Sequence, residues 1–384
     1  MRVLVLNPGS STLKAVVLEP PAREPLATIA LELEGDATRA ARREDAVARA
    51  LDRLRAAGID APTIGAVGYR VVHGGERFVG PVVVDDEILA EIEALADLAP
   101  LHNPIAIETI AAGRRMLPGI PHVAAFDTAF HASLPPDAIR YAVPPRWAAE
   151  WGVRRYGFHG LSVAWAARRS AELLALPVSE SRLVVAHLGS GCSVTAVDGG
   201  RSVHNSMGMT PLEGLVMGTR AGSLDPGILL SLLRTGRRTA PELEEDLDHR
   251  SGLLGLSGRT ADTRELLAAE SRGDEAARLA LAVFVRSAAA GIAAAASAVP
   301  ALDAVVFTGG IGEHAGLIRQ RIVGRLAVLG LPPLPDEDPS VDQGASERDR
   351  RIGPVTRTGP AVLRVAARED IVIAEATAAA IASA

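Results

Sequence analysis

Three glycine-rich segments carry residues that could bind phosphate. The first, NPGSSTLK at 7–14, offers the amide of Asn7, three hydroxyls and the ammonium of Lys14. HLGSGCS at 187–193 and TGGIGEH at 308–314 likewise follow apolar runs. Backbone N–H groups in such turns cradle anions, and hydroxyl and ammonium groups orient and neutralise phosphoryl oxygens. One such segment alone would be explained more simply as a Ser-rich hairpin turn, but three of them, each directly after a β run, favour a bound nucleotide.

Lys14 is the only lysine among the 40 basic residues of the chain; the other 39 are arginines. A compact ammonium inside a Gly/Ser turn can serve a role that the broad guanidinium fork would not fill. The alternative is that a single lysine persists by chance in an arginine-biased sequence.

Two arginines and two histidines lie among small residues. Arg70 in GYRVVHGGE and Arg220 in MGTRAGSLDPG have glycine neighbours that leave a guanidinium accessible to carboxylate or phosphate. His159 in YGFHGLS and His102 in APLHNP could donate to a charged group during its transfer. Each arginine could equally be one more surface arginine, and each histidine taken alone is more often structural.

Two acidic residues lie at the ends of predicted secondary structure, one just after a strand and one at the start of a helix. Asp127 in AFDTAFH comes just after a predicted strand, where it could take a proton, position a cation or cap a turn. Glu369 begins the last predicted helix, where it could help to hold Mg²⁺ or only favour the helix dipole. His131 in the same motif as Asp127 is interpreted as structural. The spacing of histidines and the single Cys192 exclude a zinc cluster.

The elements that must position these residues form two similar halves. The apolar runs around the first two glycine turns, 3–17 and 183–197, each predict a strand–turn–strand hairpin, and the repeat suggests a duplicated unit. Asn103 is expected to be the N-cap of a helix and Pro104 its first residue. The strand at 304–308 is expected to be followed by a glycine turn. Residues 331–360 predict a surface loop with short strands. Further strands are expected at 64–72, 122–126 and 361–366, and helices at 37–57, 85–98, 104–116, 226–234, 241–248, 274–298 and 369–383.

Composition narrows the class of protein. The 384 residues suggest two domains, and a net charge of −6 gives no reason to expect nucleic-acid binding. No apolar run is expected to span a membrane, because Arg278 and Arg286 interrupt the Ala-rich segment 276–299. The single cysteine fits a reducing cytoplasm.

The motifs in this order resemble those of the acetate kinases over essentially the whole chain. The matching segments include NPGSSTLK, YRVVHGG, LAPLHNP, FDTAFH, RYGFHG, HLGSG, TPLEGLVMGTRAGSLDP, FTGGIGEH and the late RED. The resemblance implies an α/β protein with the duplicated actin-like (ribonuclease H-like) ATPase fold, in which two lobes hold mixed sheets flanked by helices. It places the acyl substrate and Mg²⁺ in an N-terminal lobe, 1–128 plus 370–384, and the nucleotide in a C-terminal lobe, 129–369.

The resemblance also implies roles for individual residues. Asn7 and Glu369 would hold Mg²⁺ (with Mn²⁺ as a substitute), and Lys14 would lie near the phosphates. Arg70 would bind the acyl carboxylate beside Asp127, and His159 and Arg220 would stabilise the transition state. The acyl site would be lined by Val72, Leu101, His102, Phe158 and Pro211. The nucleotide would contact His187, Leu188, Gly189, Ser190, Gly191, Asp262, Thr263, Arg264, Gly310, Ile311, Gly312, Glu313 and His314.

The implied activity is reversible phosphoryl transfer from ATP to acetate, by a cytoplasmic homodimer that binds neither nucleic acid nor membrane. Propionate kinase activity and pyrophosphate as donor stay open on the same scaffold. Three positions depart from the family pattern near the nucleotide, namely Ser190, Thr263 and His314. An actin-like nucleotide switch is the alternative of a different class, although a switch would not need a carboxylate-binding arginine.

Overall fold

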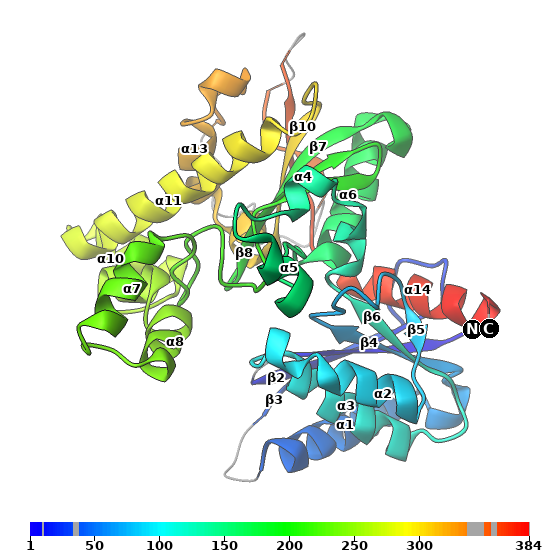
Figure 1. Cartoon of the computed structure of the whole chain (residues 1–384). Coiled ribbons are helices and arrows are strands. Elements are labelled where there is room, and N and C mark those ends of the chain that lie inside the picture. The colour runs from blue at the N-terminus through cyan, green and yellow to red at the C-terminus, as the bar shows by residue number, and fades with distance from the viewer. Residues whose placement is uncertain (10, 34–37, 336–348, 355–358, 384) are drawn as a thin grey trace. The chain divides into compact units, whose positions relative to one another are not determined.

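The computed structural model describes residues 1–9, 11–33, 38–335, 349–354 and 359–383 (Figure 1). The chain divides into two compact units, which are described separately below. The first unit comprises Met1–Ala132, Phe158–Trp165 and Arg368–Ala384, and the second comprises Ser133–Gly157 and Ala166–Ala367.

The first unit contains a mixed six-stranded sheet in the order β3-β2-β1-β4-β6-β5. Strands β1, β2 and β3 form an antiparallel meander, whereas β4 is parallel to β1, β6 is parallel to β4, and β5 is antiparallel to β6. The strands are β1 (Val3–Pro8), β2 (Thr12–Leu18), β3 (Ala27–Glu32), β4 (Ala66–Val71), β5 (Val82–Val83) and β6 (His122–Phe126).

Helices cover both faces of this sheet. Because successive strand residues point to opposite faces, Leu4 and Leu6 join one apolar core while Val3 and Val5 join another. The core with Leu4 packs under α1 (Arg39–Ala56), α2 (Asp86–Ala94) and α3 (Asn103–Met116). The core with Val3 packs under α14 (Glu369–Ser383), which lies on the opposite face in Figure 1. A Cβ on Gly68 of β4 would lie 2.4 Å from the Thr377 hydroxyl, so this glycine permits close packing of α14.

The second unit repeats the same topology. Its sheet has the order β11-β12-β10-β7-β8-β9, and every pair has the direction of its counterpart in the first sheet. The predicted duplication and the α/β fold class are confirmed. The strands are β7 (Arg182–Leu188), β8 (Cys192–Asp198), β9 (Arg201–Asn205), β10 (Ala304–Thr308), β11 (Arg350–Arg351) and β12 (Ala361–Arg364).

The longest helix of the second unit is α11 (Glu275–Ala296), which packs against β7 and β8 with nine buried residues along one side. By length and composition alone it could cross a membrane in spite of Arg278 and Arg286, a test that the core helix of a soluble protein also passes. Its contacts are those of a core helix. The other helices are α4 (Pro136–Ile139), α5 (Pro145–Trp151), α7 (Pro226–Arg234), α8 (Ala240–His249), α9 (Gly252–Ser257), α10 (Thr263–Ser271), α12 (Gly309–His314) and α13 (Gly316–Val323), and α6 (Gly160–Leu174) is divided between the units.

Two local predictions were wrong. His102, not Asn103, is the N-cap of α3; Asn103 is buried, and its amide exchanges two hydrogen bonds of 3.0 Å with the backbone of His73. The segment after β10 is not a turn but the short helix α12, which Gly309 enters at φ +78°. Much of the predicted loop at 331–360 lies outside the described residues, as does Ser10 of the first glycine segment.

Candidate functional site

The candidate site of the first unit lies where three parallel strands end. Asn7 is near the end of β1, Arg70 near the end of β4, and Asp127 directly after β6. Since parallel strands end at the same edge of a sheet, the topology brings these side chains together. Glu369 joins them as the first residue of α14, which packs on the same strands.

Arg70 is the centre of this cluster. Its Nη2 donates to Asp127 Oδ2 at 2.6 Å, and its Nε donates to both carboxylate oxygens at 3.1 and 3.3 Å. Its Nε also lies 3.6 Å from Glu369 Oε2. Asn7 Nδ2 donates to the same Glu369 oxygen at 2.8 Å, and the adjacent strand places Lys14 directly opposite Asn7.

Burial makes the electrostatics of this cluster unusual. Burial raises the pKa of Asp127 to about 6; Arg70 opposes this shift and the negative charge of Glu369 adds to it. For Arg70, burial acts to lower the pKa, but Asp127 and Glu369 outweigh it, so the pKa rises. The guanidinium therefore stays charged, and it holds two carboxylates that would otherwise repel each other.

His159 lies beside this cluster, because the residues on either side of it are hydrogen-bonded to the segment that contains Asp127. Gly160 N donates to Asp127 O at 3.0 Å, and His131 Nε2 is 2.9 Å from Phe158 O. The ring of Phe158 packs edge-on against His73, with centroids 5.3 Å apart. The FDTAFH, YRVVHGG and RYGFHG motifs thus meet in one place.

The residues predicted to line the acyl site are divided between the two units. Val72, Leu101, His102 and Phe158 belong to the first unit, and Phe158 is the most deeply buried of them. Pro211 belongs to the second unit, where its carbonyl lies 3.4 Å from Arg220 Nη1.

In the second unit, two of the predicted phosphate-binding segments lie side by side. The turn after β7 approaches the start of α12 so closely that a Cβ on Gly309 would lie 2.8 Å from Leu188 O and 3.1 Å from His187 Nε2. A Cβ on Gly189 would lie 3.8 Å from Gly310 N. The turn after β7 and the start of α12 are therefore adjacent, and Gly189 N itself donates to Gly191 O at 3.0 Å.

The segment with Arg220 joins the same turn. Gly218 N donates to Ser190 O at 3.1 Å, and an added Cβ at Gly218 would lie 3.5 Å from that of Ala261. Arg220 is 3.3 Å from Asp248 Oδ1, a carboxylate that no sequence pattern singled out. Burial lowers the pKa of Arg220, while Asp248 and Cys192 oppose this shift.

Several predicted nucleotide residues have evident structural tasks. Asp262 caps α10 by accepting from Arg264 N at 2.8 Å, and it pairs with the Arg264 guanidinium at 2.5 Å. Thr263 is buried. Glu313 Oε1 accepts from Ala367 N at 2.9 Å, and His314 is exposed. Ile311 and Gly312 lie in α12.

Two buried arginines hold glycine-rich segments by their carbonyls, and the sequence did not single out either. Arg43 of α1 donates to Thr12 O at 2.9 Å and to Gly9 O at 2.5 Å. Arg319 of α13 donates through Nη1 to the carbonyls of Gly312 and Glu313, both at 2.8 Å. Each residue is 0% exposed, and these are the two largest fully buried side chains in the described part of the chain.

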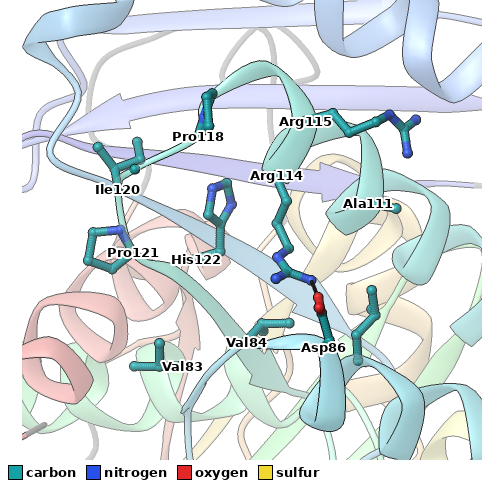
Figure 2. Close-up of a pocket in the computed structure, with 12 residues that line it drawn as sticks. Val83, Val84, Asp86, Ala111, Arg114, Arg115, Pro118, Ile120, Pro121 and His122 are labelled. Atoms are coloured by element: carbon teal, nitrogen blue, oxygen red, sulfur yellow. Dashed lines mark ion pairs between the residues drawn. The ribbon is translucent and has the colours of Figure 1, made fainter.

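A pocket of about 570 Å³ lies elsewhere in the first unit (Figure 2). The turn from Pro118 to Pro121 and strand β5 flank it, and Arg114 reaches across to Asp86 at 2.8 Å. None of the predicted site residues lines this pocket. Its two arginines form ion pairs, Arg114 with Asp86 and Arg115 with Glu44. It is not part of the candidate site.

Comparison with known proteins identifies the relatives of this chain. The model of the acetokinase family matches residues 2–375. The chain belongs to the acetokinase family. It is 44% identical to the acetate kinase of Deinococcus radiodurans over 395 aligned residues, which cover 98% of each chain. The predicted family and enzyme class, a phosphotransferase, are confirmed.

Solved structures of the acetokinase family agree with the fold. The acetate kinase of Porphyromonas gingivalis has a TM-score of 0.85 and 34% identity, covering 99% of each chain. A propionate kinase from Francisella tularensis has a TM-score of 0.86 and 34% identity, covering 98% of this chain and 99% of its own. The duplicated fold is therefore shared along the whole length of these relatives.

Proposed function

We propose that this chain is an acetate kinase that transfers the γ-phosphoryl group of ATP to acetate, reversibly and with Mg²⁺, to give acetyl phosphate and ADP. Near full-length similarity to an acetate kinase supports the activity. The single structural observation that carries the proposal is Arg70, a partly buried and permanently charged group held by Asp127 after β6 and by Glu369 at the start of α14.

The geometry of Arg70 suits a second carboxylate. Asp127 occupies its Nε and Nη2, whereas Nη1 has no hydrogen-bond partner among the described residues, and the side chain is 21% exposed. An arginine fork matches a carboxylate better than any other side chain. We assign Nη1 to the substrate, with Val72, Leu101, His102, Phe158 and Pro211 around the acyl group.

The chemistry requires neutralisation of charge more than a base. A carboxylate oxygen of acetate attacks the γ-phosphorus, the bond from phosphorus to the bridging oxygen of ADP breaks, and ADP keeps that electron pair. No proton is transferred, because acetate is already ionised. Two anions must nevertheless approach each other, and phosphoryl transfer depends on positive groups around the equatorial oxygens. In this proposal His159 and Arg220 supply them, and transfer is direct and in line.

The donor set fits Mg²⁺. Asn7 Nδ2 donates to Glu369 Oε2 at 2.8 Å, so the amide oxygen of Asn7 and the carboxylate of Glu369 belong to neighbouring side chains. Mg²⁺ is usually held by one or two such oxygens together with substrate phosphates. Among the described residues there is no cluster of three His, Cys, Asp or Glu side chains that would suit another metal. When bound, Mg²⁺ (or Mn²⁺) would neutralise phosphate charge, and Lys14 would add to that effect.

The second unit is proposed to hold the nucleotide. The support is the close approach of the turn at 187–191 to the start of α12, because glycine-rich turns of this kind bind phosphate through their backbone N–H groups. Asp262 to Arg264 and Gly310 to His314 would surround the adenosine. We further propose that the enzyme is a cytoplasmic homodimer.

Propionate kinase activity is the second candidate, because the similar Francisella tularensis structure is a propionate kinase. The test is acyl-phosphate formation from Mg·ATP, trapped with hydroxylamine, with acetate, propionate and butyrate in parallel. One extra methylene changes binding by only about 1–3 kcal/mol, so weaker propionate turnover is expected beside strong acetate turnover. A preference for propionate would support the second candidate, and no product with any acid would contradict both.

A further inference from the structure

His159 has an unusual backbone conformation. Its φ is +60°, and it is one of two non-glycine residues with positive φ in the described part of the chain; the other is Ala175. Side chains disfavour this left-handed region, and residues held there tend to cluster at active sites where the surroundings enforce the conformation. The contacts on either side of His159 show what enforces it.

Both neighbours of His159 are fixed by one segment, the residues that follow β6. Gly160 N donates to Asp127 O at 3.0 Å. Phe158 O lies 2.9 Å from His131 Nε2. Because a carbonyl oxygen can only accept, His131 must carry its proton on Nε2 and donate. The peptide groups before and after His159 are therefore both hydrogen-bonded to FDTAFH.

The packing around this arrangement leaves little freedom. His131 and Phe158 are each 1% exposed. A Cβ on Gly160 would lie 2.1 Å from Asp127 O and 2.8 Å from Phe130 Cβ, so only glycine fits there. Burial lowers the pKa of His131 to about 4, so its ring is neutral near pH 7 and keeps the donating tautomer.

We propose that His131 is a positioning residue for His159: its Nε2–H holds the Phe158 carbonyl and so keeps His159 in the left-handed conformation that presents its imidazole to the transferring phosphoryl group. The proposal rests on the function proposed above for His159. His131 itself contacts neither substrate nor phosphate in this scheme. Its effect is on the transition state, through the orientation of another side chain.

The test compares variants of His131 that keep or remove the donor to the Phe158 carbonyl. Misplacement of a catalytic group can cost up to about a hundredfold in rate, so His131→Leu should lower kcat by about tenfold to a hundredfold. The KM values for acetate and Mg·ATP should change by less than about threefold, because ground-state binding does not depend on His159. His131→Gln, which keeps an amide donor, should recover most of kcat. His131→Met replaces His131→Leu if the latter does not fold.

The chain offers a matched control in His122. Its ring is also buried, 5% exposed, and its Nε2 lies 3.1 Å from the backbone carbonyl of Leu117. His122→Leu therefore removes the same kind of bond away from His159. A kcat for His131→Leu no lower than that of His122→Leu, or an equal loss in His131→Gln, would overturn the proposal.

A structural measurement separates this proposal from the proposed function. Crystal structures of the wild type and His131→Leu should show φ of His159 leaving the left-handed region in the variant only. An unchanged φ would overturn the positioning role whatever the activity. If the wild type forms no acyl phosphate, the proposed function fails, but the comparison of φ still decides whether His131 sets the backbone of His159.

Discussion

Arg70 donates hydrogen bonds to the Asp127 carboxylate from both Nε and Nη2, at 2.6 to 3.3 Å, although the two residues are 57 positions apart in the chain. This ion pair connects β4 to the end of β6, and only 1% of the Asp127 side chain is exposed to solvent. A partly buried arginine that already holds one carboxylate is oriented before a second carboxylate arrives. This preorganisation reduces the entropy lost on binding.

The first prediction concerns Arg70. A lysine at this position would carry the same charge but only a single ammonium, which cannot hold Asp127 with a fork and offer another nitrogen to the substrate. Arg70→Lys should therefore raise the KM for acetate at least about tenfold, equivalent to ~1.4 kcal/mol of lost binding, and also lower kcat. Steady-state kinetics with hydroxylamine trapping measures both parameters.

Arg77→Lys is the matched control, because Arg77 pairs with Glu91 at the exposed surface of the same unit. Its kinetics should equal those of the wild type. An unchanged KM for acetate in Arg70→Lys would mean that Arg70 does not bind the acid.

The second prediction concerns pH. The pKa of Asp127 is raised from 3.8 to about 6 by burial, with Glu369 adding and Arg70 opposing. Between these values the folded protein holds a proton that the unfolded chain releases, so the contribution of Asp127 to the free energy of unfolding falls as pH rises from about 4 to about 6. Above that range the contribution is constant.

Asp127→Asn lacks this titration and serves as the reference. Urea unfolding of both proteins in EDTA, at pH values from about 4.5 to about 7, gives the difference between their free energies of unfolding. This difference should favour the wild type more at the acid end. A difference that grows with pH would show that Arg70, not burial, dominates the pKa of Asp127.

Much of this site followed from local sequence patterns. Apolar runs predicted β1, β4, β6 and β7, and residues that follow parallel strands necessarily meet at one edge of the sheet. The resemblance of the motifs to a known family then assigned roles to Arg70 and Asp127. Here the pattern sufficed because strand alternation and glycine turns are local properties.

Contacts between distant segments could not be predicted in the same way. Arg43 and Arg319 differ from the other arginines only in what surrounds them, and a composition with 39 arginines conceals that difference. Asn103 has the residue type of an N-cap, but its hydrogen bonds to His73 depend on a partner 30 positions away. The left-handed conformation of His159 arises from tertiary contacts that no local propensity records.

The third prediction concerns the two buried arginines. Arg43→Met should leave the carbonyls of Gly9 and Thr12 without these donors, and Arg319→Met should do the same to Gly312 and Glu313. Loss of partners to buried polar groups costs about 1–3 kcal/mol each, so each variant, which affects two carbonyls, should lose about 2–6 kcal/mol of stability. Urea unfolding followed by circular dichroism measures the loss.

Arg53→Met is the control for both, because Arg53 lies in α1 with its side chain at the exposed surface. A surface change of this kind should stay within about 0.5 kcal/mol of the wild type. Losses as small as that in Arg43→Met or Arg319→Met would show that the glycine-rich segments do not depend on these arginines.

The last prediction concerns the proposed metal residues. Glu369→Gln keeps an oxygen that can accept from Asn7 Nδ2 but removes the charge that Mg²⁺ prefers. The Mg²⁺ concentration for half-maximal activity should rise at least about tenfold, since each ~1.4 kcal/mol of lost binding is a factor of ten. The KM for acetate should change less, because Glu369 is 3.6 Å from Arg70 Nε and Asp127 provides the shorter contacts.

Glu19→Gln, which alters an exposed glutamate paired with Arg2, should leave the Mg²⁺ dependence unchanged. If Glu369→Gln instead raises the KM for acetate alone, Glu369 orients Arg70 and does not hold the metal.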